Sequence, residues 1–212
     1  MEGSACASTL VGVSSDQDPV SGLSAAKVIG ERIFLRAPHV DDADEFRALV
    51  DASRDFLREW EPWCPPDHDP DGNLRLRRTL AADARPENQK HFVCRRSDGA
   101  LLGTMNINNI VRGVFRSASL GYWIGAAHAR QGYMTEALRL ILRHAFRTER
   151  LHRLEANIRP ENVASIALVR RAGFRLEGLS KRYLKIAGRW RDHERWALLA
   201  EEWRVSSYGH VP

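Results

Sequence analysis

The stretch from Leu120 to Ala137 constrains this chain more than any other part of its sequence. Its first part, Leu120-Gly-Tyr-Trp-Ile-Gly125, combines glycines with aliphatic and aromatic residues and predicts a β-strand. Its second part, Ala129-Arg-Gln-Gly-Tyr-Met-Thr-Glu-Ala137, opens a segment that continues to about Arg147. Apolar residues of that segment recur on one helical face: Ala137, Leu138, Ile141, Leu142, Ala145 and Phe146. The sequence therefore predicts a strand, a short loop and a helix in succession.

The predicted loop has the properties of an anion-binding site. N–H groups at the start of a helix have no partner within the helix, and the helix dipole adds partial positive charge there. Gly132 lets a ligand approach the backbone closely, and Arg130 supplies a cation. The expected backbone donors are those of Gln131, Gly132, Tyr133, Met134 and Thr135. A pyrophosphate group suits such a site.

The remaining patterns predict one mixed α/β domain. The chain has 212 residues and 43% hydrophobic content, which suits a single core. Strand patterns occur in seven segments, at 31–36, 91–96, 101–108, 120–125, 154–158, 183–187 and 190–199. Helical patterns lie between them, the first after Asp41 as its expected cap. We expect a flexible N-terminal extension over residues 1–26, a folded domain over 27–204 and a C-terminal tail over 205–212.

Several classes of protein are excluded by composition. No stretch approaches the run of about 18 apolar residues that crosses a bilayer, and the N-terminus lacks the pattern of a secretory signal. Cys6, Cys64 and Cys94 are odd in number and far apart, so they predict neither a disulfide framework nor a zinc site. We therefore expect a reduced, cytoplasmic compartment and no metal.

Together with the segment downstream, the loop resembles the acetyl-CoA site of the GCN5-related N-acetyltransferase (GNAT) superfamily, and the RimJ/RimL type within it. The segments that carry the resemblance are Leu154-Glu-Ala-Asn-Ile158, Arg159-Pro-Glu-Asn-Val-Ala-Ser165 and Val169-Arg-Arg-Ala-Gly-Phe174. The pyrophosphate loop of the family would fall on Ala129 to Met134, where Gly132 matches strictly. The resemblance covers residues 31 to 204 and implies a GNAT fold with a V-shaped splay between the strands at 120 and 154.

The resemblance also assigns roles within this splay. Unpaired backbone groups near Tyr122, Trp123 and Ile124 would hydrogen-bond the pantetheine arm and the acetyl oxygen. Asn162 would contact pantetheine, and Ser165 would protonate the departing sulfur. Asn and Ser are also ordinary residues at a helix start, so capping alone is an equally weighted reading of both.

The segment Trp60-Glu-Pro-Trp-Cys-Pro-Pro66 has two possible roles. Its three prolines forbid a helix and favour an extended loop. Trp60 and Trp63 could cover the core, or they could form a wall of the acceptor site together with Glu61, as the resemblance to RimJ-like sequences implies. Asp192, in the predicted C-terminal hairpin, is a further acceptor-site candidate.

The catalytic base is left open among three acids. Glu155 is the nearest acid on a predicted site-forming strand, and Glu61 and Asp192 are its rivals. An α-amine has a pKa of about 8, against about 10.4 for lysine, so near pH 7.5 roughly a quarter of α-amines are already neutral. An N-terminal acceptor would therefore need only a weak base.

The sequence thus predicts an acetyl-CoA-dependent N-acetyltransferase that acts on an N-terminal amine. A ribosomal protein with alanine as its first residue is the first choice of acceptor, and the enzyme could be a monomer or a homodimer. The alternatives are a small-molecule amine acetyltransferase and a non-catalytic CoA-binding or ribosome-assembly factor. The net charge of +5 would attract polyanionic CoA or a ribosomal partner. Direct nucleic-acid recognition is not expected, because the arginines are spread along the sequence.

Overall fold

The protein folds around one mixed eight-stranded sheet in the order β1-β2-β3-β4-β5-β6-β8-β7. This is seen in a computed structural model that describes residues 26–61 and 73–205. The strands are β1 (Ala26–Ile29), β2 (Ile33–Arg36), β3 (Phe92–Arg95), β4 (Leu101–Val111), β5 (Ser117–Ile124), β6 (Arg153–Ile158), β7 (Arg175–Ile186) and β8 (Arg189–Leu199). The predicted mixed α/β architecture is confirmed. Most of the expected extension and tail lies outside the described residues.

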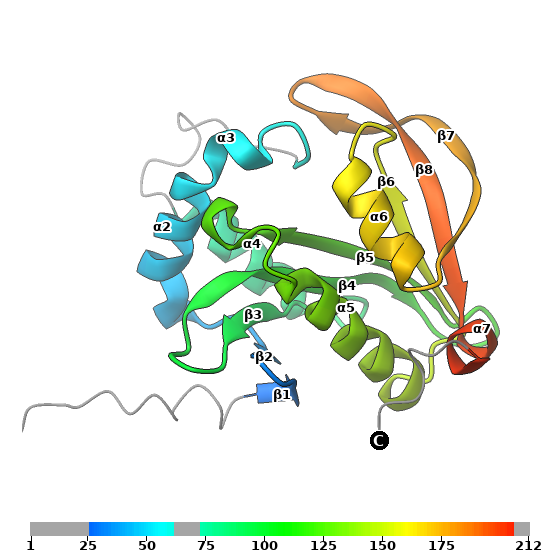
Figure 1. Cartoon of the computed structure of the whole chain (residues 1–212), viewed down its shortest axis with the longest axis horizontal. Helices are drawn as coiled ribbons and strands as arrows, with labels where there is room; N and C mark the ends of the chain where they lie inside the picture. The colour runs from blue at the N-terminus through cyan, green and yellow to red at the C-terminus, as the bar shows by residue number, and fades with distance from the viewer. Residues whose placement is uncertain (1–25, 62–72, 206–212) are drawn as a thin grey trace, which may run out of the picture.

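Helices cover both faces of the sheet (Figure 1). One face carries α5 (Tyr133–Arg143), which continues into a π-helical turn at His144–Thr148, and α6 (Val163–Arg171). The other face carries α2 (Ala43–Ala52), α3 (Arg54–Leu57) and α4 (Leu74–Asp83). The chain ends its described part with α7 (Ala200–Val205). Among the described residues, no helix is long and apolar enough to span a membrane.

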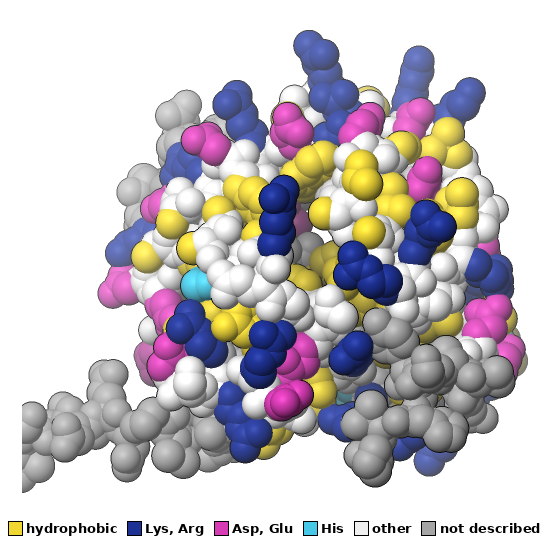
Figure 2. Space-filling view, viewed as in Figure 1, with side chains coloured by type: hydrophobic (Ala, Val, Ile, Leu, Met, Phe, Trp, Pro, Cys, Tyr) yellow, Lys and Arg dark blue, Asp and Glu magenta, His cyan; other side chains and the backbone are white. Residues whose placement is uncertain are grey.

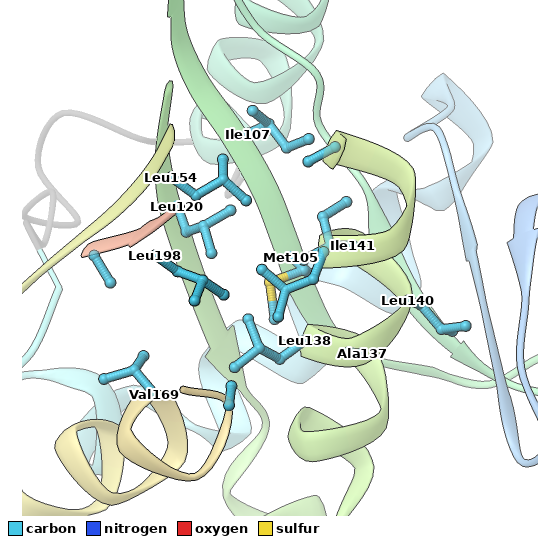
Figure 3. Packing of buried hydrophobic residues seen from close by; sticks show 14 of the residues in the cluster. Met105, Ile107, Leu120, Ala137, Leu138, Leu140, Ile141, Leu154, Val169 and Leu198 are labelled. Atoms are coloured by element: carbon cyan, nitrogen blue, oxygen red, sulfur yellow. The ribbon is translucent and has the colours of Figure 1, made fainter. Parts of the chain in front are cut away.

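The larger of two cores lies between the sheet and the α5–α6 face. Figure 3 shows Leu138 and Ile141 of α5 pointing toward Met105 of β4, with Leu120 of β5 and Leu154 of β6 beside them. All five of these side chains are at most 7% exposed. The predicted apolar face of the 133–147 helix is thus confirmed as the face that packs on the sheet.

The second core lies on the opposite face and is built from aromatic residues. Phe46 of α2 stacks on Phe92 of β3 with ring centroids 5.1 Å apart, and it lies 5.9 Å from Trp123 of β5. Leu57 of α3 and Leu76 of α4 close this cluster. Trp123 therefore holds β5 against the helices that follow β2.

Strands β5 and β6 part half-way along their length, as predicted. Their parallel pairing runs from Ser117 opposite Arg153 to Leu120 opposite Ala156. Beyond that point β5 stays paired with β4 as far as Ile124, and β6 stays paired with β8 as far as Ile158. The facing edges of β5 and β6 thus have no strand partner beyond Leu120 and Ala156, which leaves a V-shaped opening in the middle of the sheet.

Two local predictions need correction. The sheet has eight strands rather than seven, because the short β1 pairs with β2 at an edge where the sequence shows no alternation. Asp41 does not cap α2, since its side chain points to solvent beside His39. The neighbouring Asp42 is buried instead, and its carboxylate accepts hydrogen bonds from Arg36 Nη1 at 2.9 Å and from the His39 backbone N–H at 2.6 Å.

The larger core yields a stability prediction. Leu138→Ala should lower the free energy of unfolding by about 2–5 kcal/mol, because its side chain is 1% exposed and its removal leaves a cavity. Leu176→Ala is the matched control, since Leu176 of β7 is 51% exposed and should cost less than about 1 kcal/mol. Urea unfolding followed by circular dichroism measures both. Equal losses in the two variants would contradict the assigned packing.

Candidate active site

A hydrogen bond bridges the V-shaped opening from β5 to α6. Tyr122 lies two residues beyond the last β5–β6 pair, and its hydroxyl is 2.7 Å from Ser165 Oγ in the first turn of α6. Burial raises the pKa of Tyr122 to about 12, so this hydroxyl stays protonated at neutral pH. The opening is thus lined by two proton-bearing hydroxyl groups.

Asn162 orients Ser165. It is the N-cap of α6, and its Oδ1 accepts a hydrogen bond from the Ser165 backbone N–H at 3.1 Å. The capping contact considered for Asn162 is therefore present. Because only Oδ1 is used, Nδ2 remains as a donor beside the opening.

The loop before α5 turns sharply at two left-handed residues. Arg130 has φ +61° and Gly132 has φ +84°, and Gly132 is the N-cap of α5. The Gln131 side chain donates to the Ala127 carbonyl at 2.8 Å, so it braces the loop. The Arg130 side chain is exposed and makes no ion pair with any described residue. The first N–H groups of α5 and one free guanidinium thus lie at the same corner.

A second cation, Arg32, reaches this corner from the start of β2. Its Nη1 donates to the Gln131 carbonyl at 3.1 Å, and its guanidinium lies 4.9 Å from the centre of the Tyr133 ring. Glu136 in the first turn of α5 holds it, with Arg32 Nε 3.3 Å from Oε2 and the Arg32 backbone N 2.8 Å from Oε1. A side chain at position 132 would meet Arg32, since a Cβ there would lie 3.1 Å from Nη2.

The remaining residues predicted for the cofactor differ in their surroundings. The Trp123 side chain belongs to the second core, so only its backbone faces the opening. Tyr133 and Met134 pack partly against the larger core. Thr135 lines a groove of about 520 Å³ between α5 and the β1–β2 turn, on the flank of α5 that also carries Glu136 and Arg139.

Glu61 lies close to β5, on the face opposite α6. Its Oε2 accepts from Arg75 Nη2 at 2.8 Å, and the Arg75 guanidinium lies 4.9 Å from the centre of the Trp123 ring. Burial raises the pKa of the Glu61 carboxyl, and the charge of Arg75 opposes part of that rise. A carboxylate with a raised pKa near an opening has the properties of a proton acceptor.

Trp60 lies beside Glu61 and is held by Arg159, the residue that follows β6. The Arg159 guanidinium lies 5.3 Å from the centre of the Trp60 ring and donates to the Glu59 carbonyl. Trp63 lies outside the described residues. Arg159 thus joins the end of α3 to the end of β6 at the mouth of the opening.

The two other candidate acids have structural partners. Glu155 lies in the paired part of β6, and its carboxylate accepts from Arg153 Nε at 2.8 Å. Arg153 also pairs with Glu177 of β7. Asp192 of β8 accepts from the Arg182 backbone N–H at 2.7 Å. All three candidate acids thus have partners in the described structure. No group of three or more metal-ligating side chains occurs in the described ranges.

Comparison with known proteins decides the family. The model of the acetyltransferase (GNAT) domain matches residues 32–175. The chain belongs to the GNAT acetyltransferase family. It is 32% identical over 185 residues to the [ribosomal protein uS5]-alanine N-acetyltransferase of Escherichia coli, covering 86% of this chain and 95% of that one. It is also 35% identical over 172 residues to the probable N-acetyltransferase YjcK of Bacillus subtilis, covering 80% of this chain and 95% of that one.

A solved relative has the same fold. The structure of Mycobacterium smegmatis RimJ in complex with CoA-disulfide is 32% identical to this GNAT chain, with a TM-score of 0.78 over 87% of this chain and 90% of that one. The RimJ/RimL type that the sequence predicts is therefore confirmed.

Two residues of this GNAT site were not identified from the sequence. Asn157 of β6 lies directly after the last β5–β6 pair, and its Oδ1 is buried without a hydrogen-bond partner among the described residues. A buried acceptor of this kind is available to a ligand N–H. The second such residue is Arg32. Its position at the loop depends on a hydrogen bond with Glu136, which lies 104 residues away in the sequence. Neither position carries a motif of its own.

The cap of α6 yields a second prediction. Asn162→Ala should lower the free energy of unfolding by about 1 kcal/mol, because the Ser165 N–H loses its acceptor. Asn162→Ser should recover most of that loss, since a serine hydroxyl can cap the same N–H. Urea unfolding of the three proteins checks this. An unchanged Asn162→Ala variant would show that the cap adds nothing to stability.

Proposed function

We propose that this protein transfers the acetyl group of acetyl-CoA to the α-amine at the N-terminus of a protein. The single observation that carries the proposal is the opening between β5 and β6, with an anion-binding loop at the start of α5 and the Tyr122–Ser165 hydrogen bond across it. The relatives add support, since the RimJ structure holds a CoA disulfide and the Escherichia coli relative is named for acetylation of a ribosomal protein. We place this reaction in the cytoplasm.

Cofactor binding is assigned to the loop and to the free edge of β5. The first N–H groups of α5, with Arg130 and Arg32 beside them, would hold the pyrophosphate. Backbone groups of β5 from Tyr122 to Ile124 have no strand partner on the β6 side, so they can bind the pantetheine arm as an added strand would. Asn162 Nδ2 is a further donor to that arm. Bound acetyl-CoA supplies the activated acetyl group.

Proton transfer is assigned to residues on the two sides of the opening. The Ser165 and Tyr122 hydroxyls are placed to protonate the departing sulfur, with Tyr122 kept protonated by its raised pKa. Glu61 is our proposed weak base and the attachment point for a protonated amine, because it is an acid near the mouth with a raised pKa. Asn157 Oδ1 can orient an N–H of the ligand. Glu155 receives no catalytic role, since it lies in the part of β6 that pairs with β5, before the opening begins.

The proposed acceptor is a ribosomal protein whose first residue is alanine. Its support is the 32% identity over 86% of this chain to an enzyme named for that activity on uS5. Trp60, which is held against Arg159 at the mouth, would form a wall beside the first residue of the acceptor. Asp192 adjoins the same side of the opening on β8, where it would contact the following residues.

A prediction for the cofactor follows from Gly132. Gly132→Glu should abolish the rise in melting temperature that CoA produces, because the new carboxylate lies where the pyrophosphate is expected and faces Arg32. Gly99→Glu is the matched control, since Gly99 also has positive φ, at +76°, but lies in a turn with open space around it. Differential scanning fluorimetry with and without CoA measures the effect. A full CoA response in Gly132→Glu would remove this loop from the cofactor site.

A prediction for the acceptor follows from Glu61. Glu61→Gln should raise KM for an alanine-initiated peptide by about tenfold or more, because a charge-assisted contact to the amine is lost, while acetyl-CoA affinity stays nearly unchanged. Glu59→Gln, an exposed neighbour, is the control and should leave the peptide kinetics unaltered. The wild-type enzyme should acetylate the free α-amine well and the same peptide with only a lysine amine poorly. Equal rates on the two amines, or unchanged kinetics in Glu61→Gln, would contradict the assignment.

A further inference from the structure

The tip of the β7–β8 hairpin, residues 179–191, gathers positive charge. It contains Lys181, Arg182, Lys185, Arg189 and Arg191, and no acidic residue lies between positions 181 and 191. A two-residue turn at Ala187 and Gly188, with φ of +48° and +76°, folds the segment so that the two halves pair. The turn brings these cations to one end of the hairpin, with Lys185 on one face and Arg189 and Arg191 on the other.

The exposed cations of the tip have no ion-pair partner among the described residues. Lys181, Arg182, Lys185 and Arg189 are exposed, and none forms a salt bridge with a residue in the described part of the chain. By contrast, ion pairs join cations elsewhere to acids, as in Arg36–Asp42, Arg75–Glu61 and Arg153–Glu177. The tip therefore presents positive charges that no acidic side chain of the described residues neutralises.

Large apolar side chains are exposed among these cations. Trp190 is 60% exposed and Tyr183 is 46% exposed. Trp190 lies directly opposite Lys185 in the antiparallel register, so the two side chains share one face of the hairpin. An exposed aromatic ring beside a cation on one face is typical of surfaces that bind single-stranded nucleic acid, where bases stack on the ring and the cation contacts a phosphate.

The shape of the tip is fixed in advance by a bulge. Residues 181–183 face only Asp192 on β8, because the register shifts between Ser180 and Leu184. Arg182 has φ +50°, and its N–H donates to Asp192 Oδ1 at 2.7 Å. Asp192 thus holds the backbone of the bulge. Because the backbone of the tip is already held in one conformation, the tip loses little conformational freedom when it binds a ligand.

We propose that the hairpin tip binds single-stranded RNA. Figure 2 shows Lys and Arg side chains projecting from the upper edge of the molecule, where Figure 1 shows the β7–β8 hairpin. An acidic protein would satisfy the cations but would leave the exposed Trp190 without a stacking partner, which is why RNA is the better fit. The hairpin lies beside the mouth of the opening, since Ile158, the last residue of β6, pairs with Glu194 of β8. RNA bound at the tip would bring the N-terminus of a protein in complex with that RNA close to Glu61.

Fluorescence anisotropy with a labelled single-stranded RNA of about 20 nucleotides tests this, since single-strand sites span about 4–16 nucleotides. The wild-type chain should bind with an affinity that falls steeply with salt, by a log–log slope of about −0.7 for each phosphate contacted. Lys181→Glu/Lys185→Glu should weaken binding about tenfold or more and flatten the salt slope by about 1.4, since two phosphate contacts are lost. Trp190→Ala should weaken binding about fivefold or more through lost stacking.

Arg78→Glu/Arg85→Glu is the matched control, because it changes the net charge equally at exposed positions in α4 and just after it. It should change RNA affinity less than about twofold. An unaltered melting temperature in each variant shows that the fold is intact. The proposal is overturned if wild type binds no RNA, if the control loses as much affinity as the hairpin variant, or if polyglutamate of equal charge competes as well as RNA. Competition by polyglutamate would show that the tip binds any polyanion of equal charge, including an acidic protein.

Discussion

The parting of β5 from β6 is the constraint on which the rest of this structure depends. Each strand keeps its outer partner, β4 for β5 and β8 for β6, so the sheet stays intact while its centre opens. Backbone groups at the free edges then need a partner, and a ligand that runs between them can supply it. The residues assigned to the reaction lie on these two strands, at the helix that follows each strand or across the mouth, except Arg32 just before β2 and Asp192 on β8.

Ion pairs and capping contacts hold the elements around the opening. Glu136 ties the start of β2 to the first turn of α5 through Arg32. Arg159 links the end of β6 to Trp60 and Glu59 at the end of α3. Asn162 fixes the first turn of α6 and thereby the direction of Ser165. These contacts join segments that are up to 104 positions apart, so the site is preorganised by the fold rather than by a local motif.

Local patterns in the sequence predicted the larger part of this arrangement. The apolar face of α5, the glycine at its start and the cap of α6 depend on neighbours in sequence, and each was found. What could not be predicted depends on distant contacts: the bridge from Tyr122 to Ser165, the placing of Arg32, and the burial of Asp42 rather than Asp41. The same reason hid the hairpin tip, because its charges come to one end only when residues 184–186 pair with 189–191.

A double-mutant cycle on Tyr122 and Ser165 tests the central claim most directly, because these two side chains join the two sides of the opening. Tyr122→Phe, Ser165→Ala and the double variant would be compared by kcat with an alanine-initiated peptide and saturating acetyl-CoA. If the hydroxyls act as one proton-donating unit, each single variant should lose about 10²-fold or more, and the double variant little beyond the worse single one. Losses that multiply, or single variants that keep full turnover, would contradict the claim that acetyl transfer takes place between β5 and α6.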